Sequence, residues 1–183
     1  RNGTFGALDL YFVLLQGGAS HFNDRIGVSQ GYSADYIENG KQVILPDNFY
    51  SSNFYTDKMI NYLKEDINDD KPFFAYLAYT APHWPLQVPD EDMNLYKGYY
   101  DLGYEHVRQN RIEKLKRLGI IDETTIASMA PDYIKDWNSL SKEDKNLEIK
   151  KMEIFAAMVD NLDRNVGRVI EYLKKTGQYQ NTF

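Results

Sequence analysis

The chain has 183 residues, 43% of them hydrophobic, which is enough for the core of one ordinary domain. Its net charge of −6 and its alternating acids and bases give no support to nucleic-acid binding, and the lack of cysteine excludes disulfides and a thiol nucleophile within the chain. A mean hydropathy of −0.57 and the lack of a long apolar run predict no transmembrane helix.

The first fifty residues are rich in glycine and aromatic residues and predict short strands. Residues 10–15 form an apolar run that Gly17 and Gly18 end, which indicates a buried strand. Asn39-Gly40 lies between two strand-like pieces and predicts a hairpin.

Three longer segments have the apolar spacing of helices. The first follows a cap at Ser52 or Asn53, and the second covers residues 105–118. The third begins after Ser141, which stands where a capping box needs it, and runs to about Thr176. Strands and helices together predict an α/β domain.

The clearest predicted strand is residues 73–79, FFAYLAY, which are apolar throughout. A continuous apolar run suits a strand buried on both faces of a parallel sheet. Residues that follow such a strand lie at its carboxyl end, where open α/β sheets bind ligands. His83 falls at this position.

His83 lies between Pro82 and Pro85, which restrict the backbone on both sides. An imidazole held there could donate a hydrogen bond to an anion or protonate a leaving oxygen near neutral pH. The alternative is a rigid connection whose histidine only ends the strand. The residues alone leave both interpretations open.

The other candidate groups have ordinary structural explanations. His21, in GGASHFND, could approach a ligand beside the two glycines, but a surface loop explains it more simply. His106 falls in a charged helix and is expected to be solvated. Asp160 and Asp163 are expected to form helix ion pairs with neighbouring arginines, so no metal ligand is assigned.

The segment PFFAYLAYTAPHWPLQVP resembles the central segment of type I sulfatases, the arylsulfatases of the alkaline phosphatase superfamily. LLQGGASHFND resembles the loop that precedes it, YKGYYDLGYEHVRQNRIEKLKRLGII the arm that follows it, and MEIFAAMVDNLDRNVGRVIEYLKKTGQYQNTF a later helix. The resemblance covers nearly the whole chain in the right order. It implies that residues 1–183 are the central part of a sulfatase catalytic domain.

The resemblance implies an α/β fold with a mixed, largely parallel sheet flanked by helices and incomplete at both ends. It also implies hydrolysis of sulfate monoesters by a hydrated formylglycine and a Ca²⁺ ion. His83 matches the family histidine that contacts sulfate and assists the departing alcohol. Trp84 and His21 would be its neighbours on the substrate side. The family further implies a periplasmic or secreted protein.

The motifs that would complete such a site are not in this sequence. No cysteine or serine stands in a C/S-x-P-x-R motif, and the metal-binding aspartate pair and the S-D-N-G segment are missing. We expect the nucleophile and the Ca²⁺ ligands outside residues 1–183. Exposed strand edges would then favour self-association.

Two other functions remain open at this point. The chain could belong to a non-catalytic domain that binds sulfated glycans or other anions through His83 and nearby aromatic residues. It could also belong to a phosphonate or phosphodiester hydrolase of the same superfamily. The aromatic-rich pattern after His83 favours sulfate esters.

We predict that the 183-residue chain alone gives no sustained turnover of aryl sulfates, because the expected nucleophile and metal ligands lie outside it. Product release from an aryl sulfate, followed over many equivalents of protein, checks this. Sustained release would contradict the prediction.

Overall fold

The computed structural model describes residues 9–29, 31–65, 67, 71–128 and 130–183, which belong to two compact units. The first unit comprises residues 1–90 and 158–183, and the second comprises residues 91–157. In the described residues, no helix is both long enough and apolar enough to cross a membrane.

The first unit contains a small antiparallel sheet. Strands β1 (Phe12–Leu14), β2 (Tyr36–Glu38) and β3 (Lys41–Gln42) lie in the order β1-β2-β3. The predicted hairpin is confirmed: Asn39 and Gly40 both have positive φ, the backbone that a two-residue turn needs. The described strands pair antiparallel, unlike the largely parallel sheet expected from the sequence.

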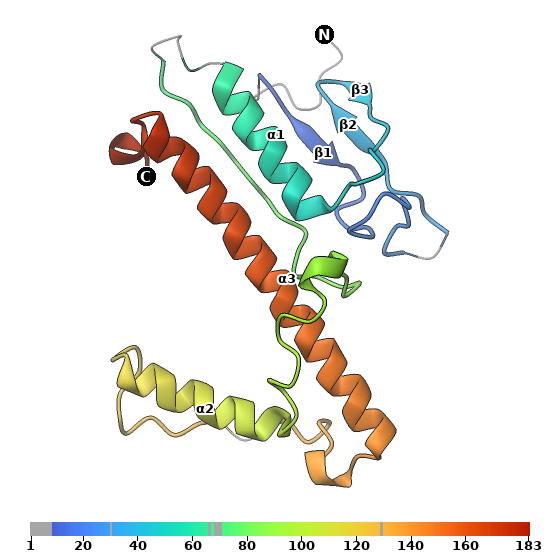
Figure 1. The fold of residues 1–183 in the computed structure, drawn as a ribbon, viewed down its shortest axis with the longest axis vertical. Helices are drawn as coiled ribbons and strands as arrows, with labels where there is room; N and C mark the ends of the chain where they lie inside the picture. Colours follow the sequence, from blue (N-terminus) through green and yellow to red (C-terminus); the bar gives the residue numbers. More distant parts are fainter. Residues whose placement is uncertain (1–8, 30, 66, 68–70, 129) are drawn as a thin grey trace. The chain divides into compact units, whose positions relative to one another are not determined.

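Helix α1 (Ser51–Glu65) lies beside this sheet (Figure 1). It begins at Ser51, so Ser52 and Asn53 lie in its first turn rather than at the cap. Between helix and sheet is an aromatic core in which rings contact at centroid distances of 5.1–6.4 Å. This core is formed by Phe12, Tyr36, Phe49, Phe54 and Tyr55.

The strand predicted at residues 73–79 is not a strand in the structure. The chain from 71 to 80 is drawn as an extended trace along α1 (Figure 1), and no sheet pairing is assigned to it among the described residues. Leu77 and Tyr79 pack against the aromatic core, and the Tyr79 hydroxyl lies 2.7 Å from Thr56 Oγ1 of α1. The predicted burial on both faces is also wrong, since Phe74 is 82% and Tyr76 74% exposed. An apolar run indicates a preference for burial, but a strand also needs a neighbouring backbone.

Helix α3 (Lys142–Lys175) begins and ends as the sequence predicts. The Ser141 hydroxyl accepts a hydrogen bond from the Asp144 amide at 3.0 Å, and Gly177 follows the helix with φ of +74°. Residues 158–175 of α3 belong to the first unit. The capping signals at the two ends of α3 are local in sequence, which explains why the ends of the helix could be predicted.

A buried polar seam joins α3 to α1 in the first unit. The side-chain Nδ2 of Asn165 donates to Asn53 Oδ1 at 2.8 Å. Arg168 donates to Asn165 Oδ1 and also pairs with Asp57. Arg168 therefore bonds across to α1, whereas Arg164 makes the expected pair with Asp160 along the helix. Asn165 itself is 2% exposed, whereas the Arg168–Asp57 pair lies at the exposed edge of this seam.

The second unit contains α2 (Gly103–Arg117), the first part of α3 and the short 3₁₀ helix η2 (Trp137–Ser139). Gly103 has φ of +82°, and a Cβ atom there would lie 2.3 Å from the Trp137 ring. Tyr104 packs edge-on against the same ring. Glycine at position 103 is thus required by both conformation and space.

We predict that Asn165→Ala lowers the free energy of unfolding by about 1–3 kcal/mol, because it removes the hydrogen bonds that this buried side chain makes to Asn53 of α1 and to Asn161 of α3. Urea denaturation followed by circular dichroism measures this. Asn146→Ala, at an exposed position of the same helix, is the matched control and should change stability little. Equal effects of the two substitutions would contradict the role of the seam.

Candidate functional site

His83 lies just beyond the extended segment, in a turn closed by its own amide, which donates to the Thr80 carbonyl at 3.1 Å. The Ala81–Pro82 and Trp84–Pro85 peptide bonds on either side are cis. The His83 side chain is exposed, so the turn presents its ring to solvent.

The hydrogen bonds of His83 define which ring nitrogen is available for chemistry. Nδ1 lies 2.7 Å from the Trp84 carbonyl oxygen, which can only accept, so Nδ1 carries a proton. Within the described residues, no hydrogen bond is assigned to Nε2. Nε2 is therefore the ring nitrogen of His83 that its neighbours leave unoccupied in the described structure.

Trp84 gives the site an aromatic surface. Its side chain is 58% exposed, and its ring centroid lies 5.2 Å from that of His83. The two rings, predicted together as substrate contacts, are neighbours at the protein surface. A role in substrate binding stays a prediction for both.

The structure places His21 differently from the expected surface loop. His21 is 1% exposed, and its Nε2 lies 3.0 Å from the main-chain oxygen of His83. Its Nδ1 lies 2.8 Å from Ser51 Oγ, at the first residue of α1. Both ring nitrogens are thus occupied inside the protein, which corrects the interpretation of His21 as a solvent-facing loop residue.

A second group of bonds fixes the same three segments to one another. Gln87 Oε1 accepts from the His21 amide at 2.8 Å, and the Gln87 carbonyl accepts from the Tyr50 hydroxyl at 3.0 Å. The Ser51 amide donates to the His21 carbonyl at 2.9 Å. The loop at 20–24, the start of α1 and the turn at 80–88 are therefore held as one body.

Burial sets the protonation of His21. Burial lowers the pKa of the His21 imidazole below its usual value, and nearby His83 lowers it further, although the hydrogen bond to the His83 carbonyl acts in the opposite direction. His21 is accordingly neutral at pH 7. Because its Nε2 faces a carbonyl, the proton is on Nε2, and Nδ1 accepts from the Ser51 hydroxyl.

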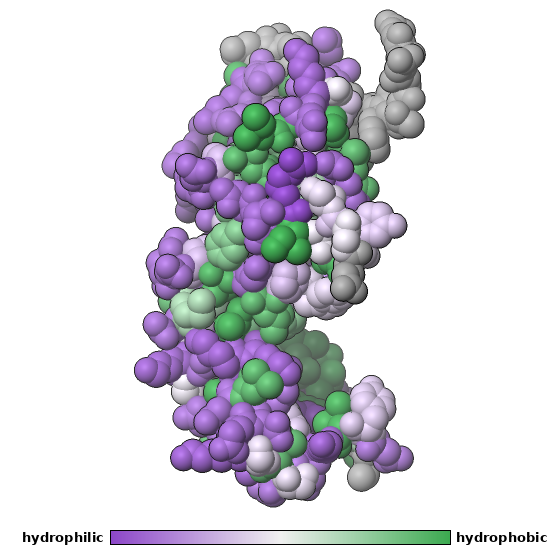
Figure 2. Space-filling view, turned by 90° about the vertical axis from the view of Figure 1, so that its right-hand side faces the viewer, coloured by the Kyte–Doolittle hydropathy of each residue, from purple (hydrophilic) through white to green (hydrophobic). Residues whose placement is uncertain are grey.

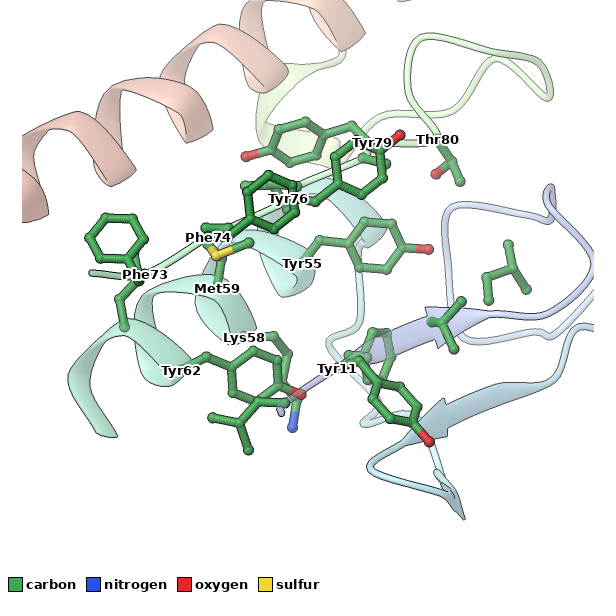
Figure 3. A pocket seen from close by; sticks show the side chains of 18 of the residues that line it. Tyr11, Tyr55, Lys58, Met59, Tyr62, Phe73, Phe74, Tyr76, Tyr79 and Thr80 are labelled. Carbon is green, nitrogen blue, oxygen red and sulfur yellow. The ribbon is translucent and has the colours of Figure 1, made fainter. Parts of the chain in front are cut away.

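A cavity of about 1410 Å³ in the first unit adjoins His83. It is lined by β1, by one face of α1 and by the extended segment, with His21, His83 and Trp84 in its wall. Figure 3 shows that the labelled side chains around it are mostly aromatic. The cavity thus brings together the three predicted site residues, although 62 positions separate His21 from His83.

Lys58, one of the charged residues that line the cavity, is paired with a neighbouring carboxylate. Lys58 donates to the Glu38 carboxylate at 2.6 Å, and Tyr62 donates to the same group at 2.8 Å. Although burial opposes its ionisation, these hydrogen bonds lower the pKa of the Glu38 carboxyl. Lys58 is therefore engaged by its own partner rather than free for a bound anion.

Among the described residues, no group of three or more His, Asp or Glu side chains is arranged to hold a metal ion. The residues present do not fit a Ca²⁺ site, and we assign no chemical step to a metal here. Ser51 and Gln87, which support the site, were missed by sequence reasoning. Gln87 lies in the same proline-rich stretch as His83, but nothing local reveals its partners.

The model of the family described as Sulfatase matches residues 2–183. The chain belongs to the sulfatase family. This sulfatase chain is 42% identical over 174 residues to the arylsulfatase of Klebsiella aerogenes, covering 93% of itself and 37% of that protein. It is 42% identical over 180 residues to an uncharacterized sulfatase of Schizosaccharomyces pombe, covering 94% of itself and 32% of that protein.

Among solved structures, the chain is similar to Ps i-CgsB in complex with k-i-k-neocarrahexaose, with a TM-score of 0.58 and 27% identity. The match covers 96% of this chain and 30% of that one. The α/β sulfatase-like fold predicted from the sequence is thereby confirmed. The sulfatase chain spans about a third of the length of the curated relatives that it matches.

We predict that acid destabilises this sulfatase chain partly through His21. A histidine with a lowered pKa binds fewer protons when folded than when unfolded, so its stabilising effect is present above pH 6.5 and is lost as pH falls below it. The His21→Asn variant should show a weaker dependence of the unfolding free energy on pH between about 7.5 and 5.5, by at most about 1.4 kcal/mol per pH unit.

Denaturant titrations at several pH values measure this slope. His106→Asn is the control, since His106 is exposed on α2 and bonds only to Asn110 in the described structure. An unchanged slope in His21→Asn, or an equal change in the control, would contradict the prediction.

Proposed function

We propose that the complete protein that carries this chain hydrolyses sulfate monoesters, with aryl sulfates as the first substrates to test. One observation carries the proposal: His83 is an exposed residue whose Nε2 has no assigned hydrogen bond in the described structure, while the Trp84 carbonyl holds its Nδ1 proton. Membership of the sulfatase family and the similarity to an arylsulfatase support the reaction class.

In this reaction His83 acts on the leaving group. As the bond between sulfur and the ester oxygen breaks, its electron pair stays on that oxygen, which needs a proton to depart as an alcohol. Protonated His83 donates the proton from Nε2, and its Nδ1–H bond to Trp84 remains in place. The neutral ring with a proton on Nδ1 is then the product state of the side chain.

The attack on sulfur requires groups outside this chain. We propose that a formylglycine nucleophile and Ca²⁺ are supplied there, and a divalent cation would neutralise the sulfate oxygens. This chain would contribute the proton donor and the aromatic wall beside it.

The partner molecule is proposed to be a small sulfate ester or a sulfated glycan. Trp84 supports either choice, because an exposed aromatic face stacks on aryl groups and on sugar rings. Ps i-CgsB was solved with a bound oligosaccharide, which makes sulfated oligosaccharides the second class to test.

We predict that His83→Ala, made in the complete protein, lowers kcat/KM for an aryl sulfate by about 10²–10⁴-fold, the usual contribution of a general acid. Steady-state kinetics measure this, and His106→Ala is the control. An unchanged kcat/KM in His83→Ala would contradict the role of His83. Faster hydrolysis of the phosphate ester of the same alcohol would contradict the substrate class.

A further inference from the structure

The ring of His21 contacts the main chain of His83 and not the His83 ring. The imidazole of His21 donates from Nε2 to the His83 carbonyl at 3.0 Å, across 62 residues of sequence. His21 is 1% exposed and both of its ring nitrogens are occupied, so no ring nitrogen is left to bond a substrate. Its contacts are those of a support.

The support continues behind His21 as a chain of hydrogen bonds that run in one direction. Thr80 Oγ1 donates to Ser51 Oγ at 3.4 Å, and Ser51 Oγ donates to His21 Nδ1 at 2.8 Å. His21 Nε2 then donates to His83, three residues after Thr80. This series of hydrogen bonds therefore begins and ends in the same turn and passes through the start of α1.

We propose that His21 is a positioning residue that fixes the main chain of His83 and so aims its Nε2 at the leaving oxygen. This inference rests on the proposed function of His83. The His83 amide is already held by Thr80, and Nδ1 of its ring is held by Trp84. The bond from His21 to the carbonyl fixes the remaining polar group of the His83 main chain.

The chemistry of the network explains why a histidine suits position 21. The residue there must accept a hydrogen bond from Ser51 and donate one to His83, on opposite sides of a rigid ring. Neutral imidazole does both at once. Asparagine reaches about as far as Nδ1 and can serve only Ser51. Glutamine reaches about as far as Nε2 and can still donate to the His83 carbonyl.

This difference gives a matched pair of variants in the complete protein. Kinetics are measured with two sulfate esters, one of an acidic phenol and one of a simple alkanol. The alkanol is the poorer leaving group, so hydrolysis of its ester depends more on a proton donor. We expect His21→Asn to lower kcat/KM at least roughly tenfold more for the alkanol ester than for the phenol ester, because the proton donor is misplaced. His21→Gln should recover most of this selective loss.

The double variant His21→Asn/His83→Ala separates positioning from general structural support. If His21 acts through His83, the double variant has the kcat/KM of His83→Ala alone. Additive losses, or equal losses on both esters in His21→Asn and His21→Gln, would overturn the proposal. If His83→Ala alone leaves the activity unchanged, the proposed function fails instead, which is a distinguishable result.

A measurement on the unsubstituted chain does not depend on activity or on the folding of variants. Long-range ¹⁵N–¹H NMR spectra report which nitrogen of a neutral histidine carries the proton. We expect the proton of His21 on Nε2 and that of His83 on Nδ1, as their carbonyl partners require. A proton on Nδ1 of His21 would overturn the proposal, because His21 could not then donate to His83.

Discussion

The site is organised by the need of one buried imidazole to satisfy both of its nitrogens. A buried polar atom without a partner costs about 1–3 kcal/mol, so His21 stays buried only where it has a donor and an acceptor. Ser51 provides the donor and the His83 carbonyl the acceptor. Meeting this requirement brings a loop, a helix start and a turn into one fixed arrangement.

The arrangement separates two kinds of environment around His83. On one side are the polar groups that hold its backbone, and on the other is a cavity lined mostly by aliphatic and aromatic residues. Hydrogen bonds and charges act more strongly beside such apolar surfaces than in water. Lys58 is paired with Glu38, so the wall adds little net charge to the site.

Features with local sequence rules were predictable. The Asn39-Gly40 turn and the Ser141 cap depend on a few adjacent residues, and both stand where the sequence placed them. The proposed role of His83 rests on its flanking prolines and a family resemblance, and it stays a prediction. The contacts of His21 could not be predicted in this way, because its partners lie 30 and 62 positions away.

For the segment before His83, the prediction from the sequence was wrong in both burial and strand pairing. Its apolar run indicated burial, yet Phe74 is 82% exposed, and no sheet pairing is assigned from 71 to 80. Hydrophobic residues also reach the surface on the face drawn in Figure 2. Apolar pattern describes a preference for burial, while pairing depends on backbone that is distant in the sequence.

The extended segment also has a consequence for the distribution of stability along the chain. Amides without ladder bonds exchange their bonds with water, so such a stretch opens at little cost in free energy. Residues 80–88, in contrast, are joined to two other segments by several bonds. The bonds that hold the main chain of His83 therefore lie within residues 80–88 and between this segment and two others, and none of them is made by residues 71–79.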